Sequence, residues 1–170
     1  MVEYSAWDFG DENRLFTSNS NKWHLYYQDF VEIAMGGPLA GKLYLKDHRG
    51  KQILIDEFAA GPPVWHSESD KFVVPKWDKD RTQELWMINL NNFEKTVFNE
   101  KFRVLELHEF VEDKIIGIDG PIHYPRKLNL SSRDDGIKMP LEKKRVKGSR
   151  GKNVLIWFIV IIVSILLIFW

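Results

Sequence analysis

The chain of 170 residues contains no cysteine. This absence excludes disulfide bonds, thiol nucleophiles, iron–sulfur clusters and zinc sites built on cysteine. It fits a reducing compartment. The first 142 residues also lack a sustained helical period, and no apolar stretch near the N-terminus has the form of a signal peptide. The sequence therefore favours a β-rich body over a helical one.

Charge of either sign is absent from residues 153–170, and Ser164 is the one polar residue between 154 and 170. A helix over this segment would be roughly 27 Å long, which is close to the thickness of a bilayer's hydrocarbon core. We therefore predict a transmembrane anchor at 153–170. Trp157 and Trp170 are expected near the two membrane interfaces, where tryptophan is enriched.

A basic juxtamembrane linker, residues 143–152, precedes this segment and contains no acidic residue. Its six cations are Lys143, Lys144, Arg145, Lys147, Arg150 and Lys152. Lys and Arg beside a membrane span stay on the cytoplasmic side, so we expect a single-pass protein with its N-terminal body in the cytoplasm. The linker should also attract anionic lipid, at about 1 kcal/mol per residue near the surface.

The overall charge is balanced, with 24 basic and 24 acidic residues, but residues 1–142 hold 18 basic against 24 acidic side chains. Nucleic-acid binding depends on Lys and Arg contacts to phosphate. An acidic body is poorly suited to such contacts, so no nucleic-acid partner is predicted.

The body, residues 1–142, contains an internal repeat. Trp23-His24 recurs as Trp65-His66 and Leu107-His108, with a spacing of 42 residues. Short apolar runs between turn-forming residues predict about four antiparallel strands in each unit, with equivalent hairpins near 43–55, 85–98 and 128–141. The residues predicted to form the repeat core are Trp23, Trp65, Phe30, Phe72, Leu43, Leu85 and Leu128.

Residues 61–74, followed by 84–90, resemble a blade of the TolB-like and prolyl-oligopeptidase-type propellers. Those blades typically read Pro-x-Trp-Ser-Pro-Asp-Gly-Lys before an apolar strand, and this chain departs from that pattern at His66, Ser67 and Ser69. Residues 7–16 resemble the last hairpin of a preceding blade.

The resemblance covers roughly residues 5–142. It implies an all-β fold of antiparallel four-stranded blade-like repeats, a partial β-propeller of about three and a half blades, followed by one C-terminal transmembrane helix. No Gly-x-Ser-x-Gly nucleophile motif is present. The resemblance therefore implies architecture and not hydrolysis.

Other motifs in the sequence resemble sites of chemistry. Residues 36–42 approach a phosphate-loop pattern, but Leu43 stands where a hydroxyl is needed, and we interpret the segment as a turn. His24, His66 and His108 at equivalent positions suggest either a metal site or structural hydrogen bonds, and the latter is favoured. The tryptophans at 23, 65, 77 and 86 are interpreted as core between repeats. No catalytic residue, metal or cofactor is predicted.

These observations favour a membrane-anchored, cytoplasm-facing protein-binding module. One alternative is a non-catalytic accessory subunit or remnant of a propeller-containing hydrolase, and another is a small inhibitory or immunity-type protein. The expected partners are the membrane and either a second protein or another copy of the chain. Self-association is considered because three and a half blades would leave sheet edges open.

Overall fold

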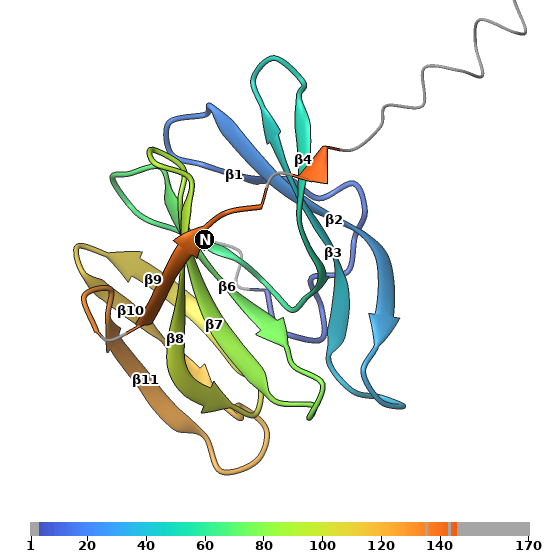
Figure 1. The fold of residues 1–170 in the computed structure, drawn as a ribbon. Coiled ribbons are helices and arrows are strands. Elements are labelled where there is room, and N and C mark those ends of the chain that lie inside the picture. The colour runs from blue at the N-terminus through green and yellow to red at the C-terminus, as the bar shows by residue number, and fades with distance from the viewer. Residues whose placement is uncertain (1–3, 135, 143, 146–170) are drawn as a thin grey trace, which may run out of the picture.

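The computed structural model of this protein describes residues 4–134, 136–142 and 144–145 (Figure 1). Within these residues all regular structure is β, and every strand pairing is antiparallel. The prediction of an all-β antiparallel body is therefore confirmed. The predicted anchor at 153–170, with Trp157 and Trp170, lies outside the described residues, as do Lys143, Lys147, Arg150 and Lys152.

The strands follow the repeat that the sequence predicts. The first unit contains β1 (Phe16–Thr17), β2 (Trp23–Glu32), β3 (Leu39–Asp47) and β4 (Gln52–Ala59), paired in chain order. The second contains β5 (Val64–Trp65), β6 (Lys71–Trp77), β7 (Gln83–Asn89) and β8 (Glu94–Phe102), also paired in chain order. The predicted hairpins near 43–55 and 85–98 are the β3–β4 and β7–β8 pairs.

The third unit begins in the same way and then departs from the repeat. Strands β9 (Leu105–Val111), β10 (Lys114–Asp119) and β11 (Arg126–Ser131) form a separate three-stranded sheet. The hairpin predicted near 128–141 is wrong, because β12 (Gly136–Pro140) does not pair with β11. It crosses to the second unit and pairs with β8, with Gly136 opposite Phe98 and Pro140 opposite Glu94.

Burial of Leu141 accounts for this crossing. The Leu141 side chain is 6% exposed and packs in a core that the first two units share, while its N–H donates to the carbonyl of Phe93 at 2.8 Å. Strand β13 (Lys144–Arg145) then pairs with β4. Two residues of the predicted linker therefore continue the pairing of the body, and we call residues 136–142 and 144–145 the C-terminal return.

The described strands form one ten-stranded sheet and the three-stranded sheet, and they close neither a barrel nor a propeller. No helix among the described residues has the length and apolar character needed to cross a membrane. The first two units join edge to edge at a single residue pair in this part of the chain, Ala59 with Lys76. Backbone pairing alone therefore contributes little to their association.

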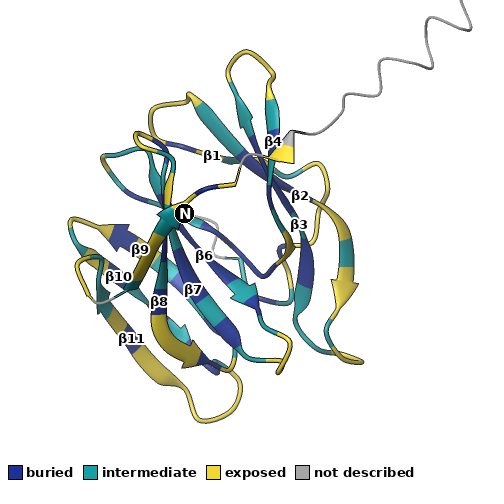
Figure 2. Cartoon of the chain, viewed as in Figure 1, coloured by how far each residue is buried: buried dark blue, intermediate teal, exposed yellow. Residues whose placement is uncertain are grey.

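Two apolar cores hold the units together, and Figure 2 shows buried residues along the strands on both sides of the body. The first core joins units one and two, and the second joins units two and three. Of the residues predicted as repeat core, Phe72, Leu43, Leu85 and Leu128 are buried. Trp23, Trp65 and Phe30 are half-buried and pack against the first core.

Hydrogen bonds also cross between units. The Trp65 indole Nε1 donates to the carbonyl of Phe16 at 2.9 Å, which ties the second unit to the first. His66 ties the second unit to the third, because its Nδ1 accepts from the Glu68 N–H at 3.0 Å and its Nε2 donates to the carbonyl of Glu112 at 2.7 Å. Satisfied buried polar groups of this kind fix the geometry of packed units.

We predict that Leu141→Ala lowers the free energy of unfolding by about 2–4 kcal/mol, because it removes a buried side chain and leaves a cavity in the shared core. Urea unfolding of the full chain in detergent measures the change. Ile137→Ala on the same return is the control, since Ile137 is 59% exposed and should change stability by less than about 0.5 kcal/mol. Equal effects of the two substitutions would contradict the role given to Leu141.

Candidate functional site

Three loops at equivalent positions of the repeat lie at one end of the body. They are residues 33–38 between β2 and β3, 78–82 between β6 and β7, and 120–125 between β10 and β11. Figure 1 shows all three along the lower edge of the molecule. We call them the distal loops, because β13 directs the chain toward the other end.

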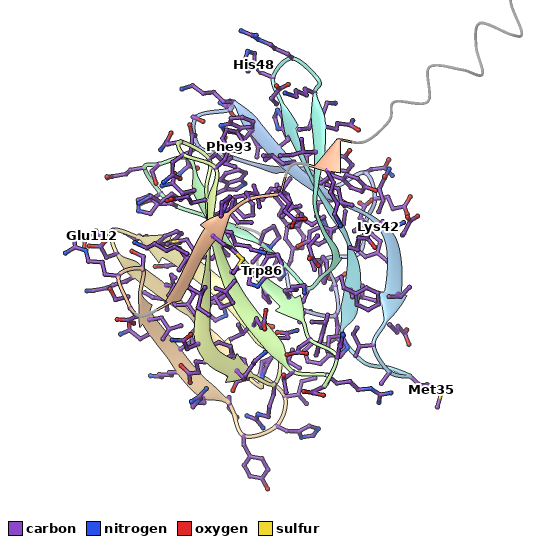
Figure 3. The ribbon with its side chains drawn as sticks, in the orientation of Figure 1. Met35, Lys42, His48, Trp86, Phe93 and Glu112 are labelled. Carbon is purple, nitrogen blue, oxygen red and sulfur yellow. The ribbon has the colours of Figure 1, made fainter. Side chains whose placement is uncertain are left out.

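The direction of β13 follows from its register. Lys144 pairs with Leu54 and Arg145 with Ile53, so the chain runs toward the turn between β3 and β4, which contains His48. Figure 3 shows His48 at the top of the molecule and Met35, from the first distal loop, at the lower right. The C-terminal return and the distal loops are thus directed toward opposite ends of the body.

The outer two distal loops expose large apolar side chains. Met35 is 100% exposed, Tyr124 89% and Ile122 60%. The middle loop is charged, with Asp78, Lys79, Asp80 and Arg81 in sequence. Aromatic residues and methionine are enriched at protein interfaces, and apolar groups beside charged ones are typical of a contact surface. The distal loops therefore form a candidate protein-binding surface.

The third distal loop is held in a fixed conformation by Arg103. Its guanidinium donates from Nη1 to the carbonyl of His123 at 2.9 Å and from Nη2 to the carbonyl of Tyr124 at 2.8 Å. The backbone N–H of Arg103 donates to Asp119 at 2.8 Å, which fixes the base of the loop. Tyr124 adopts a positive φ of 55°, a backbone conformation that side chains rarely adopt without such support.

The other two loops are held by a backbone hydrogen bond and by ion pairs, respectively. In the first, the Gly37 N–H donates to the carbonyl of Ala34 at 2.7 Å. In the second, the Lys101 ammonium binds the Asp78 carboxylate and also Glu84 at 2.7 Å. The hydrogen bond from Lys101 lowers the pKa of Asp78. Loops that are ordered before binding lose less conformational entropy when a partner docks.

A second feature is a cleft of about 330 Å³ beneath the C-terminal return, which we call the Trp86 cleft. It lies between β4, the β7–β8 hairpin and residues 139–142 and 144. Its lining combines apolar and charged side chains: Leu54, Ile55, Asp56, Glu57, Trp86, Lys95, Met139, Pro140, Leu141, Glu142 and Lys144. Figure 3 shows Trp86 near the middle of the body.

Trp86 organises the charges around the cleft. The Lys95 Nζ lies 3.5 Å from the centre of the indole ring and the Lys76 Nζ lies 4.9 Å from it. The indole N–H donates to Glu84 at 3.0 Å. Cations over an indole face are attracted by its π-electrons, so Trp86 holds both lysine ammonium groups in place.

Burial shifts the pKa of two groups in this cleft in opposite directions. It raises the pKa of Asp56, although a hydrogen bond from the Phe58 N–H and the charges of Lys76 and Lys95 partly oppose the shift. It lowers the pKa of Lys95, against the attraction of Asp56. Both shifts mean that the charged form of each group is less stable in the cleft than in water.

The three histidines at equivalent repeat positions contact different partners and do not form a common site. His24 bonds Thr17 at 3.0 Å, His66 bonds Glu112, and His108 lies 3.4 Å from Glu106. No group of three or more His, Cys, Asp or Glu that could hold a metal ion occurs among the described residues. Gly36-Lys42, the segment compared with a phosphate loop, supplies the turn before β3 and the first part of that strand.

Sequence reasoning missed both candidate surfaces. In the sequence, Gly37-Pro38 recurs as Gly120-Pro121, and this is the signal that could have placed two distal loops at equivalent positions. Trp86 was interpreted as core between repeats, and it is buried in the first core. Asp56 and Lys95 belong to no motif, so nothing in the sequence indicated that they share a cleft. The chain matches no protein-family model, and comparisons with curated proteins and with solved structures found no match.

We predict that Asp56→Asn raises the free energy of unfolding at pH 7. The folded-state pKa of Asp56 is raised, so the ionised carboxylate destabilises the fold above that pKa, and the penalty disappears as falling pH protonates the group in both states. The stability difference between variant and wild type should therefore shrink between pH 7 and pH 3.5.

Asp78→Asn is the matched control and should have the opposite sign. The pKa of Asp78 is lowered, so its ionised form stabilises the fold at neutral pH, and this contribution is lost as the pH falls through the folded-state pKa. Urea unfolding of both variants at several pH values measures the two trends. A destabilised Asp56→Asn at pH 7 would contradict the burial penalty assigned to this carboxylate.

Proposed function

We propose that this chain is a membrane-anchored, cytoplasm-facing protein-binding module whose distal loops contact the partner. The observation that carries the proposal is the exposure of Met35, Ile122 and Tyr124 on ordered loops. An exposed apolar side chain on a rigid loop contributes little to the stability of the monomer. It contributes to binding when a partner covers it and removes its surface from water.

The membrane part of the proposal rests on the sequence. The uncharged residues 153–170 would span the bilayer, and the cations of 143–152 would keep the body in the cytoplasm. Because β13 runs toward the end of the body opposite to the distal loops, an anchor that follows it leaves these loops accessible to a partner.

We also propose that the body is an open, partial propeller. Support comes from the two consecutive four-stranded units, β1–β4 and β5–β8, and from the blade-like sequence of the second. Two alternatives share this architecture and differ in the partner that the module binds. One is an accessory subunit of a hydrolase, and the other is a small inhibitory or immunity-type protein. β11 ends an edge of the three-stranded sheet, and self-association would use this edge.

We predict that Tyr124→Ser together with Met35→Ser weakens partner binding at least tenfold and leaves the melting temperature within about 2 °C of wild type, because neither side chain is buried. The measurement is site-specific photocrosslinking of the full chain in its native membrane, followed by affinity measurement with the captured protein. His48→Ser, at the opposite end, is the control. Unchanged affinity for the loop variant, or equal loss with His48→Ser, would refute the assigned surface.

We predict that deletion of residues 153–170 moves the protein from the membrane fraction to the soluble fraction. The reason is the loss of the apolar segment, since the remaining cations alone give weak, salt-sensitive attraction to lipid. Fractionation in high salt separates the two contributions. In sealed, right-side-out cells, external protease should leave the body of the full chain intact, and digestion from outside would contradict the proposed orientation.

A further inference from the structure

Asp56 and Lys95 present opposite charges in the Trp86 cleft without being paired to each other. The Asp56 carboxylate accepts the Phe58 N–H at 2.7 Å, and its ion-pair contact within the described residues is Lys76 at 4.0 Å. The Lys95 ammonium lies over Trp86 at 3.5 Å and makes no ion pair or hydrogen bond with the described residues. Both charges are partly desolvated, and neither has an ion pair closer than 4.0 Å among the described residues, so each can still bind an opposite charge in the cleft.

The rest of the cleft limits what could satisfy these charges. Glu57, Glu142 and Lys144 also line it, so its acidic and basic groups are nearly balanced. A ligand with one charge would be attracted by one of the two central groups and repelled by the other. A ligand that carries one positive and one negative charge can be attracted by Asp56 and by Lys95 at the same time.

The walls and the volume limit the ligand further. Leu54, Ile55, Met139 and Leu141 supply apolar surface beside the charged pair. A volume of about 330 Å³ lies at the lower end of the range for small-molecule sites. The cleft therefore suits a small molecule with two opposite charges at one end and an apolar group at the other.

We infer that the Trp86 cleft binds a free α-amino acid with an apolar side chain. Lys95 donates to its carboxylate, Asp56 accepts from its ammonium group, and the side chain packs against the apolar wall formed by β4 and the C-terminal return. Trp86 keeps the Lys95 ammonium oriented through its ring. This site is separate from the distal loops and does not depend on the proposed protein partner.

Isothermal titration calorimetry of the full chain in detergent micelles tests the inference. L-leucine is the probe, N-acetyl-L-leucine retains the carboxylate alone, and L-leucinamide retains the ammonium alone. The variants are Lys95→Met and Asp56→Asn, and Lys138→Met on β12 is the control because this exposed lysine is not among the residues that line the cleft.

We expect saturable binding of L-leucine, with both single-charge analogues bound at least tenfold more weakly. Each cleft variant should lose at least tenfold in affinity, which is the loss expected for a charge-assisted hydrogen bond, while Lys138→Met stays within twofold. Absence of saturable heat with L-leucine at about 10 mM overturns the inference. So does equal binding of either analogue, or unchanged affinity in Asp56→Asn, a variant that is expected to fold at least as stably as wild type. Partner capture by the distal loops is read separately, so failure here leaves that proposal standing.

Discussion

The C-terminal return is the contact on which the rest of the structure depends. The first two units meet edge to edge at one residue pair in the described chain, Ala59 with Lys76, so their relative orientation depends on contacts beyond this backbone pairing. The return pairs β12 with β8 and β13 with β4, and it places Leu141 in the core between them. It therefore ties two units that are distant from it in sequence, and it forms one wall of the Trp86 cleft.

The third unit is attached by different means. Its strands share a core with the second unit, in which Val73, Leu85 and Phe98 pack with Leu105 and Phe110. The backbone N–H of Leu105 donates to the buried Gln83 side chain at 2.6 Å. Because β12 leaves this unit, β11 keeps an open edge.

Local features of the sequence predicted most of the strands. The 42-residue spacing and the alternation of apolar and turn-forming residues were sufficient for the β3–β4 and β7–β8 hairpins, since neighbours in sequence pair there. They failed for β12, because the choice between β8 and β11 as partner depends on where Leu141 is buried, and the side chains of β12 itself are largely exposed. The same limit applies to Asp56 and Lys95, which come from different units and meet only through the packing of β4 against the second unit.

The two candidate surfaces place different demands on the fold. The distal loops need local rigidity, which Arg103 and short backbone hydrogen bonds supply within single units. The Trp86 cleft needs two units and the return to be held together, so any loosening of the return changes its shape without altering the loops. In the proposed topology the rest of the predicted linker separates β13 from the anchor. Lys144 of β13 lines the Trp86 cleft, so the cleft lies on the described strand that is nearest to the anchor in sequence, while the distal loops lie at the far end of the body.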